Sequence, residues 1–330
     1  MTAPLAKSSN QAGAALVIVL LLIATMSFIA LAISERTVLS AKRSVNARAR
    51  GELLWLGFGA ETLARAAIKA ATESAEGLMT PETPLFAAPI EFPIEGGGAV
   101  MSFADRTRCF NVNSLVTVNS NEEPAANEDA VEELKQLMDA VGATGGEGVV
   151  AAIIDWIDAD SLQEPRGAED SFYAGLPTPY RTGSAPLADP SELRAIAGVD
   201  RERYQALGAL FCARLNDTPA IINLNMLDAD DAPLLAALTR GQISAAEALD
   251  VIRARPEGGY ANAEAFWTSE AFAGKEISED MRNRGKLTSQ FIEAYAVISF
   301  GEATANLSLL FEVPDDGAPR LISRRLERFD

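Results

Sequence analysis

The sequence predicts an α+β fold in which a long N-terminal helix packs on a small antiparallel sheet and a large all-α domain is inserted into that sheet. Three features predict it. An uncharged apolar run over residues 14–33 begins a helical pattern that extends well beyond the run. Apolar residues then recur at helical spacing between about residues 122 and 281, and apolar and polar residues alternate after residue 286.

The apolar run has the length of a membrane span. Its 20 residues match the roughly 20 that cross a hydrocarbon core at about 1.5 Å per residue. A secretory signal has a shorter apolar region, roughly 7–15 residues, and then a small-residue cleavage site. Ser34, Glu35 and Arg36 follow here instead. The run alone fits either an ordinary single-pass anchor or a span used for part of the protein's life.

The helical pattern continues to about residue 74 without a proline. A helix of about 60 residues would be about 90 Å long, so it would project well beyond a membrane. We therefore expect it to pack on neighbouring helices. A stretch with four prolines and three consecutive glycines, residues 77–98, ends the helical pattern.

Strand and helix patterns divide the rest of the chain. Alternation around Val100 and over residues 109–112 predicts one or two strands, and short helices separated by Gly, Asp or Pro follow. Residues 291–313 predict two strands that turn near Gly301, and residues 320–329 predict a final strand. The expected parts are a helix over 14–76, a first part of the sheet domain over 77–120, an inserted helical domain over 121–285 and closing strands over 286–330.

Composition excludes several classes of function. The chain has 330 residues, a net charge of -18 and no histidine. The absence of histidine removes Ser-His-Asp and Cys-His nucleophile pairs, imidazole acid–base catalysis and the usual zinc sites. The acidic charge argues against phosphate-rich partners, because clustered Lys and Arg supply phosphate affinity. Aromatic residues are only 7% of the chain, too few for an aromatic-lined sugar cleft. We therefore predict that the protein is not an enzyme.

The chain contains two cysteines, Cys109 and Cys212, which are 103 positions apart. Behind an export anchor, two cysteines predict one disulfide in an oxidising compartment. The alternative is a pair of buried free thiols. Because the two ends of an inserted domain lie close together, the expected disulfide would fasten the insert to the sheet.

An acidic loop over residues 155–170 contains six carboxylates. Hard cations such as Ca²⁺ take six to eight oxygen ligands, and closely spaced Asp and Glu in a bent loop can supply them. Asp158 and Asp160 have the i, i+2 spacing of an EF-hand, but the loop as a whole does not match that motif. A solvated acidic loop is the alternative. Asp155, before Trp156, is expected to cap or pair structurally. Two Asn-x-Asn motifs, at residues 111–113 and 223–225, are expected to hold backbone groups at strand edges or turns.

Several segments, in order, resemble one family. They are "AALVIVLLLIATM" after Gly13, "RCFNVNSL", "IIDWIDADSLQEPRGAEDSFYAGLPTPYRTGSAPLADPSELRAIAGVD" and "INLNML". They resemble the K-type minor pseudopilins of the type II secretion system, general secretion pathway protein K. The resemblance runs from Gly13 to the final strands, and its most specific part covers residues 155–199. It implies a pilin-like fold, with a leader over residues 1–13.

The resemblance implies how the N-terminal helix is used. Members of this family are cut by the prepilin peptidase after a Gly, which here is Gly13, so that Ala14 becomes the N-terminus. The helix is then a membrane span before assembly and part of the core of a periplasmic pseudopilus afterwards. Major pilins have Glu five residues after the cut, whereas Ile18 stands there in this chain. K-type members share this absence, which implies a position at the tip of the pseudopilus.

The resemblance also implies ligands and partners. It implies Ca²⁺ bound in the acidic loop by Asp158, Asp160, Glu169 and Asp170, with Glu164 as a further candidate. The implied partners are the I- and J-type minor pseudopilins through their N-terminal helices, the major pseudopilin, the prepilin peptidase and the inner-membrane secretion platform. The implied location is the bacterial inner membrane, spanned once, with the C-terminal bulk in the periplasm.

A second interpretation comes from two helix pairs with the apolar spacing of helix-hairpin-helix units. Such units bind DNA in membrane-anchored competence proteins, through a tight Gly-x-Gly hairpin whose N–H groups contact phosphate. Here the first hairpin places Asp200 where a phosphate would approach, and the second, around Gly241, has a single glycine. With the acidic charge, these features favour a protein-binding surface and no nucleic acid partner.

Overall fold

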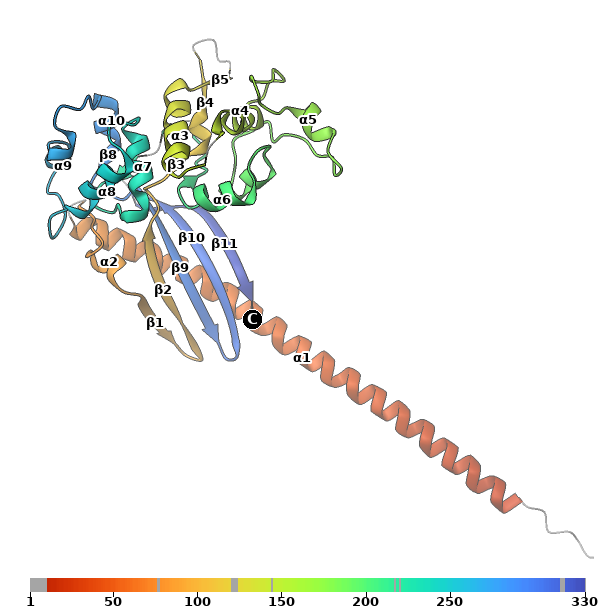
Figure 1. Cartoon of the computed structure of the whole chain (residues 1–330). Helices are drawn as coiled ribbons and strands as arrows, with labels where there is room; N and C mark the ends of the chain where they lie inside the picture. The colour runs from red at the N-terminus through yellow and green to blue at the C-terminus, as the bar shows by residue number, and fades with distance from the viewer. Residues whose placement is uncertain are drawn as a thin grey trace, which may run out of the picture.

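A computed structural model describes residues 11–75, 78–119, 124–143, 145–216, 218–219, 221–314 and 318–329. Helix α1 (Gln11–Ser74) is continuous over 64 residues. Its N-terminal half projects away from the rest of the molecule (Figure 1), and its apolar residues there are exposed. Most of the expected leader, residues 1–10, lies outside the described residues.

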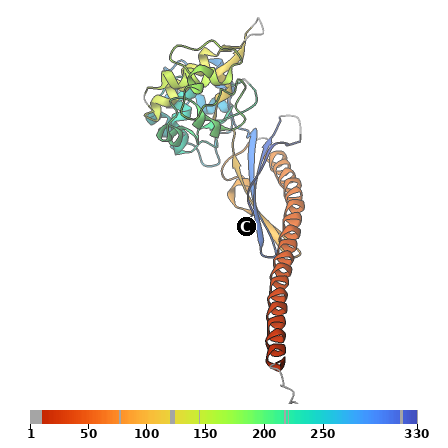
Figure 2. The same ribbon diagram turned by 90° about the vertical axis from the view of Figure 1, so that its right-hand side faces the viewer.

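The C-terminal half of α1 packs on one face of a five-stranded antiparallel sheet (Figures 1 and 2). Leu53, Ala60 and Ile68 of the helix are buried against sheet residues such as Ala294 and Phe311. Alanines on both surfaces let the helix lie close to the sheet. The strand order is β1 (Ile90–Ile94), β2 (Gly97–Asp105), β9 (Phe291–Phe300), β10 (Ala303–Glu312) and β11 (Arg320–Phe329). The predicted α+β fold is confirmed.

The predicted hairpin and final strand are present as β9, β10 and β11, with the first turn at Gly301. Strand β1 and the short helix α2 (Pro84–Ala87) lie inside the stretch that we expected only to break the chain. Pro93 explains why β1 is an edge strand, because proline cannot donate a ladder hydrogen bond. Gly96 has a φ of +83°, and a Cβ on Gly97 would lie 1.9 Å from a carbonyl oxygen of β9, so the turn requires both glycines.

The segment between β2 and β9, here termed the helical domain, lies at the end of the sheet away from the apolar half of α1 (Figure 2). Its elements are β3 (Phe110–Asn111), η1 (Val112–Leu115), β4 (Val116–Val118), β5 (Pro124–Ala126), α3 (Glu128–Ala140), α4 (Gly146–Ile157), α5 (Asp170–Ala174), η2 (Pro190–Ala195), α6 (Arg201–Leu207), β6 (Phe211–Cys212), β7 (Ile222–Asn223), η3 (Ala229–Asp231), α7 (Ala232–Leu238), α8 (Ala245–Arg253), α9 (Ala263–Trp267), η4 (Glu270–Phe272), α10 (Glu279–Arg284) and β8 (Gly285–Lys286).

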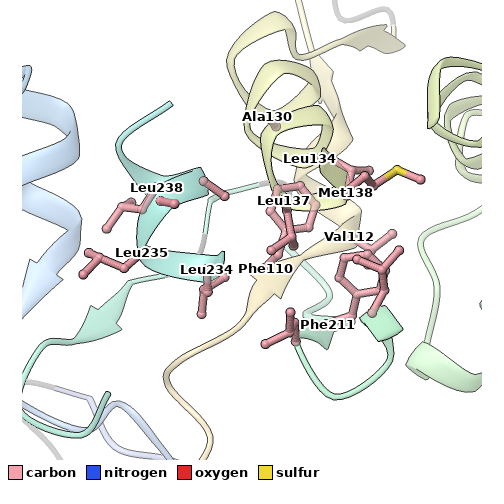
Figure 3. Packing of buried hydrophobic residues seen from close by; sticks show 14 of the residues in the cluster. Phe110, Val112, Ala130, Leu134, Leu137, Met138, Phe211, Leu234, Leu235 and Leu238 are labelled. Carbon is pink, nitrogen blue, oxygen red and sulfur yellow. The ribbon is translucent and has the colours of Figure 1, made fainter. Parts of the chain in front are cut away.

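The helical domain has its own hydrophobic core, separate from that of the sheet. Figure 3 shows Leu134 and Leu137 of α3 packed with Phe110 and Leu234 at the centre of this core. The chain leaves the sheet at Asp105 and not at the expected residue 120, because residues 110–115 are buried in the core of the helical domain.

The helical domain has a first half, residues 106–216, and a second half, residues 221–290. One Asn-x-Asn motif lies in each half, and the two motifs make the same contacts. Asn113 exchanges two hydrogen bonds with the backbone of Leu187, at 2.8 and 2.9 Å. Asn225 exchanges two with the backbone of Tyr260, at 2.8 and 3.1 Å. The predicted backbone-holding role is confirmed. The repeated motif therefore has the same structural role at two points of the helical domain.

Cys109 and Cys212 form the predicted disulfide, but it does not fasten the insert to the sheet. It joins the neighbouring parallel strands β3 and β6, both inside the helical domain. Other contacts make the junction with the sheet. The guanidinium of Arg214 donates to the carbonyl oxygen of Thr107 at 2.9 Å and lies 3.9 Å from the ring centroid of Phe291.

Candidate metal centre and membrane helix

Three of the predicted ligands come together where α4 ends. Asp158 caps the C-terminus of α4, Asp160 follows in the acidic loop, and Glu169 caps the N-terminus of α5. One carboxylate oxygen from each lies within 4.8 Å of the others. The loop between the two caps therefore brings Glu169 close to two carboxylates that lie nine and eleven positions earlier in the sequence.

Two of these carboxylates are buried without full hydrogen bonding. In the described part of the chain, Oδ1 of Asp158 and Oε1 of Glu169 have no hydrogen-bond partner, and neither has Oδ2 of the nearby Asp155. A buried carboxylate oxygen without a donor is costly. Burial, followed by the charges of Asp160, Asp155 and Glu169, raises the pKa of Asp158 to about 7. A bound cation would reverse both effects, because it would stabilise the ionised carboxylates.

Asp155 organises the loop from its centre. It is buried, its Oδ1 accepts a hydrogen bond from the backbone N–H of Glu164 at 2.8 Å, and burial raises its pKa. A Cβ at Gly167 would lie 2.0 Å from Oδ2 of Asp155, so only glycine leaves room for this carboxylate. The structural pairing expected for Asp155 is present. Asp155 is not in the group of three carboxylates described above.

The other two predicted ligands are not in the three-residue group. Oδ1 of Asp170 accepts hydrogen bonds from the backbone N–H and the hydroxyl of Thr182, both at 2.9 Å, and these bonds lower its pKa. Asp170 therefore holds the returning chain. Glu164 is half-buried, and its side chain lines a groove of about 460 Å³ between α3 and α4.

An aromatic cluster holds the elements around the carboxylates. The ring centroids of Trp156 and Tyr173 lie 5.3 Å apart, edge to face, and Tyr180 contacts both rings. The hydroxyl of Tyr173 accepts from the backbone N–H of Ala197 at 3.1 Å, and that of Tyr180 donates to the carbonyl of Ala195 at 2.8 Å. The aromatic cluster therefore supports a group of carboxylate oxygens, a donor set of the kind that suits a hard cation such as Ca²⁺ better than a transition metal.

Helix α1 contains the residues predicted for processing and for the tip position. It is the one helix among the described residues that is long and apolar enough to cross a membrane. The backbone of Gly13 and Ala14 is helical, and Ile18 is exposed on the projecting half. The helix therefore presents an apolar surface on all sides over residues 14–33.

In the two hairpins on which the DNA-binding interpretation depends, charged side chains bond to other groups of the same chain. Gly198 has a φ of +80°, as a tight turn requires. The carboxylate of Asp200 caps α6 by accepting from the backbone N–H of Arg203 at 2.8 Å, and it also pairs with that arginine's guanidinium. In the second hairpin, Arg240 pairs with Asp129 at 2.8 Å. These contacts stabilise the helix pairs and leave a carboxylate at the first hairpin, where phosphate would be repelled.

Comparisons with known proteins agree on one family. Two family models, both described as Type II secretion system (T2SS), protein K, match residues 108–216 and 222–284. Type II secretion system protein K of Pectobacterium carotovorum subsp. carotovorum is 34% identical over 259 residues, 78% of this chain and 79% of the relative. The Klebsiella pneumoniae protein of the same name is 30% identical over 308 residues, 91% of this chain and 92% of the relative.

The fold agrees with a solved structure as well. The GspK-GspI-GspJ complex from the enterotoxigenic Escherichia coli type 2 secretion system contains a chain that matches with a TM-score of 0.72 at 24% identity. The match covers 87% of this chain and 99% of that one. The boundary between the two family models falls between β6 and β7, where the second Asn-x-Asn motif begins. The chain therefore belongs to the type II secretion system protein K family and is a minor pseudopilin of that system.

Proposed function

We propose that this protein caps the tip of the periplasmic pseudopilus, helps to start its assembly for the export of folded proteins across the outer membrane, and has no enzymatic activity. The position of the helical domain carries the proposal. It lies beyond the end of the sheet, at the opposite end of the molecule from the apolar half of α1 (Figures 1 and 2). A subunit above would have to stack on the surface that this domain occupies.

The identity of residue 18, an isoleucine, also supports a place at the tip of the pseudopilus. Five residues after the proposed cut, it offers no carboxylate to the N-terminal amine of a subunit above. A buried carboxylate without such a partner would be costly, so a tip subunit gains by lacking it. Contacts beside and below remain available, because α1 keeps its apolar surface.

The proposed partners follow from the family. The solved relative is a complex of GspK with GspI and GspJ. We propose that the corresponding I- and J-type minor pseudopilins bind this chain through their N-terminal helices. We propose the major pseudopilin, the prepilin peptidase and the inner-membrane secretion platform as its further partners. Before assembly, α1 would span the inner membrane once, with the rest of the chain in the periplasm.

Imaging of labelled pseudopili tests the tip position. We expect one label at one end of each filament, because the helical domain prevents stacking above it. The Ile18→Glu variant should stay at the end, since the added carboxylate does not remove the helical domain. A label that recurs at regular intervals along the filament would show that the protein extends the pseudopilus and does not cap it.

Cleavage after Gly13 gives a second prediction. We expect the mature chain to begin at Ala14 in cells that contain the prepilin peptidase and at Met1 in cells that lack it, because the apolar run begins directly after Gly13. N-terminal sequencing of the purified protein measures this. A Met1 start in both strains would contradict it.

We also propose that Asp158, Asp160 and Glu169 bind Ca²⁺, and that the buried carboxylate of Asp155 adds negative charge beside them. The convergence of the three side chains and their unpartnered buried oxygens support the proposal. When bound, the ion would supply positive charge that holds the loop between α4 and α5 closed. Asp170 would act through Thr182, on the chain that returns from the loop.

Calcium should therefore stabilise the folded protein. At a free concentration about 100-fold above Kd, a single site adds about 2.7 kcal/mol to the free energy of unfolding. Calorimetry of the full chain in detergent should show melting raised by calcium and lowered by a chelator. The Asp158→Ala/Asp160→Ala variant should lose the shift, and the Asp139→Ala variant, changed at an exposed site on α3, should keep it. A full shift in the double variant would place the ion elsewhere.

A further inference from the structure

An apolar groove of about 460 Å³ lies between α3 and α4, apart from the group of three carboxylates. Val150, Ala151 and Ile154 of α4 form its floor, and Val131 of α3 and Pro165 of the acidic loop form its sides. Its volume is within the roughly 300–1,000 Å³ that is usual for binding pockets. The groove is therefore large enough for an apolar side chain and the chain on either side of it.

Helical spacing explains why the groove forms here. On each helix, the residues that line the groove have i, i+3, i+4, i+7 spacing, which places them on one face. They are Glu128, Val131, Glu132 and Lys135 of α3 and Glu147, Val150, Ala151 and Ile154 of α4. Leu134 and Leu137 lie on a different face of α3 and pack in the core. Helix α3 therefore presents one face to the core and another to the groove.

The rest of the helical domain holds the groove in shape. Val150 and Ile154 belong to the hydrophobic core as well as to the floor. Pro165 follows Glu164, whose backbone N–H donates to the buried carboxylate of Asp155 at 2.8 Å. Both the floor and the side made by the loop are thus fixed before a partner binds, which lowers the entropy lost on binding.

The rim of the groove is acidic. Four glutamates line the groove together with one basic residue, Lys135. The glutamates are Glu128, Glu132, Glu147 and Glu164. Among the described residues, Glu147 is the one of these four that forms an ion pair, with the surface side chain of Arg166. Carboxylates gathered in this way produce a negative potential that attracts a positively charged partner.

Charge indicates what fits the groove. Nucleic acid and anionic lipid would be repelled by the rim, and a second copy of this chain, with its net charge of -18, is also disfavoured. A single metal ion does not fit, because in the described part of the chain only Asp158, Asp160 and Glu169 converge closely enough to hold one. A polypeptide segment with an apolar side chain between Lys or Arg residues matches both the floor and the rim.

The groove lies on the side of the helical domain away from the sheet, where Figures 1 and 2 place α3, α4 and β5. In a subunit that caps the pseudopilus, this side would face away from the filament. A protein ahead of the tip would then reach the groove without displacing another pseudopilin.

We propose that the groove between α3 and α4 binds a basic segment of a protein ahead of the pseudopilus. An apolar side chain of that segment lies on the floor, and its Lys or Arg side chains lie at the acidic rim. The inference rests on the proposed function for the position of the groove, and it adds the binding surface and the chemistry of the partner.

Peptide binding tests this chemistry. Fluorescence anisotropy measures the Kd of the labelled peptide KKLKK for the full chain in an uncharged detergent, at constant calcium. We expect KKSKK to bind roughly tenfold more weakly, because serine leaves the apolar floor uncovered, and EELEE not to bind. The proposal is overturned if KKLKK shows no binding up to about 1 mM or if KKSKK binds equally well.

Two variants of opposite sign locate the binding at the groove. Glu132→Lys should raise the Kd at least about fivefold, and Lys135→Glu should lower it, because the two changes alter the charge of the rim in opposite directions. Damage to the fold would instead weaken binding in both. Glu276→Lys repeats the charge change at an exposed site in the second half and should leave the Kd within about twofold. If Glu276→Lys weakens binding as much as Glu132→Lys, the peptide responds to net charge alone and the proposal is wrong.

Imaging of labelled pseudopili separates this inference from the proposed function. If the label marks one end of the filament but binding of KKLKK is insensitive to Glu132→Lys and Lys135→Glu, the inference alone fails. If the peptide binds as expected but the label recurs along the filament, the proposed function fails and the chemistry of the groove stands.

Discussion

Replacing Arg284 with methionine is expected to lower the free energy of unfolding by about 3–5 kcal/mol, the usual result of removing one partner of a buried ion pair. Arg284, at the end of α10, donates two hydrogen bonds to the carboxylate of Glu133 on α3, at 2.6 and 2.8 Å. Their side chains are 9% and 2% exposed. Methionine fills similar volume but leaves the buried Glu133 carboxyl group without its arginine.

The loss of stability in the Arg284→Met variant should affect both halves of the helical domain. Glu133 belongs to the first half and Arg284 to the second, so the ion pair joins segments that are 151 positions apart. Urea unfolding of the full chain measures the loss. The Arg282→Met variant is a matched control, because Arg282 pairs with Glu264 at 3.6 Å on the surface and should cost at most about 1 kcal/mol.

The double variant Arg284→Met/Glu133→Leu tests the mechanism. When both charges are removed, the desolvation penalty disappears with them, and most of the lost stability should return. If the double variant is as unstable as Arg284→Met, lost packing around Arg284, and not the unpaired carboxylate, explains the effect.

Local signals in the sequence predicted the regular elements well. The alternation on either side of Gly301 gave the strands β9 and β10, and the uninterrupted apolar pattern gave α1. The same reasoning predicted helical structure between about residues 122 and 281, but Phe211, inside that range, lies in strand β6. The reason is tertiary: Phe211 pairs with Phe110, more than 100 residues earlier, and helical spacing contains no trace of that contact. Local spacing specifies a helix only where distant partners do not override it.

The candidate metal centre was predictable in composition but not in detail. Carboxylate density identified the loop, and three of the five proposed ligands meet there. Asp170 and Asp155 could not be assigned from spacing, because their roles depend on Thr182 and on the space left by Gly167. Thr182 comes close to Asp170, and Gly167 close to Asp155, only when the loop is folded. The family resemblance suggested the cation, and the structure shows which of the predicted side chains lie together.

The disulfide should contribute about as much stability as the buried ion pair. Reducing the bond between Cys109 and Cys212 is expected to lower the free energy of unfolding by about 4–5 kcal/mol, from the loop-closure entropy of about 100 residues. That loop contains α3, α4 and the acidic loop, so the crosslink restricts the unfolded form of the whole first half.

Two comparisons separate the effect of the crosslink on stability from the effect of the two cysteine side chains. Oxidised and reduced forms of the unchanged chain differ only in the bond, so their difference in urea unfolding gives its contribution directly. The Cys109→Ala/Cys212→Ala variant should unfold near the reduced form and should not respond to reductant. A reduced form as stable as the oxidised form would show that the unfolded chain is already compact without the bond.

The loss should appear in both halves of the helical domain, although the bond lies in the first. Trp156 is in the first half and Trp267 in the second, and both are buried in the same continuous core. Elements that share one core unfold together, so the fluorescence of single-tryptophan variants should give one midpoint for both positions. If Trp267 kept its midpoint while that of Trp156 fell, the two halves would be separate cooperative units. The ion pair between Arg284 and Glu133 would then be too weak to couple the unfolding of the two halves.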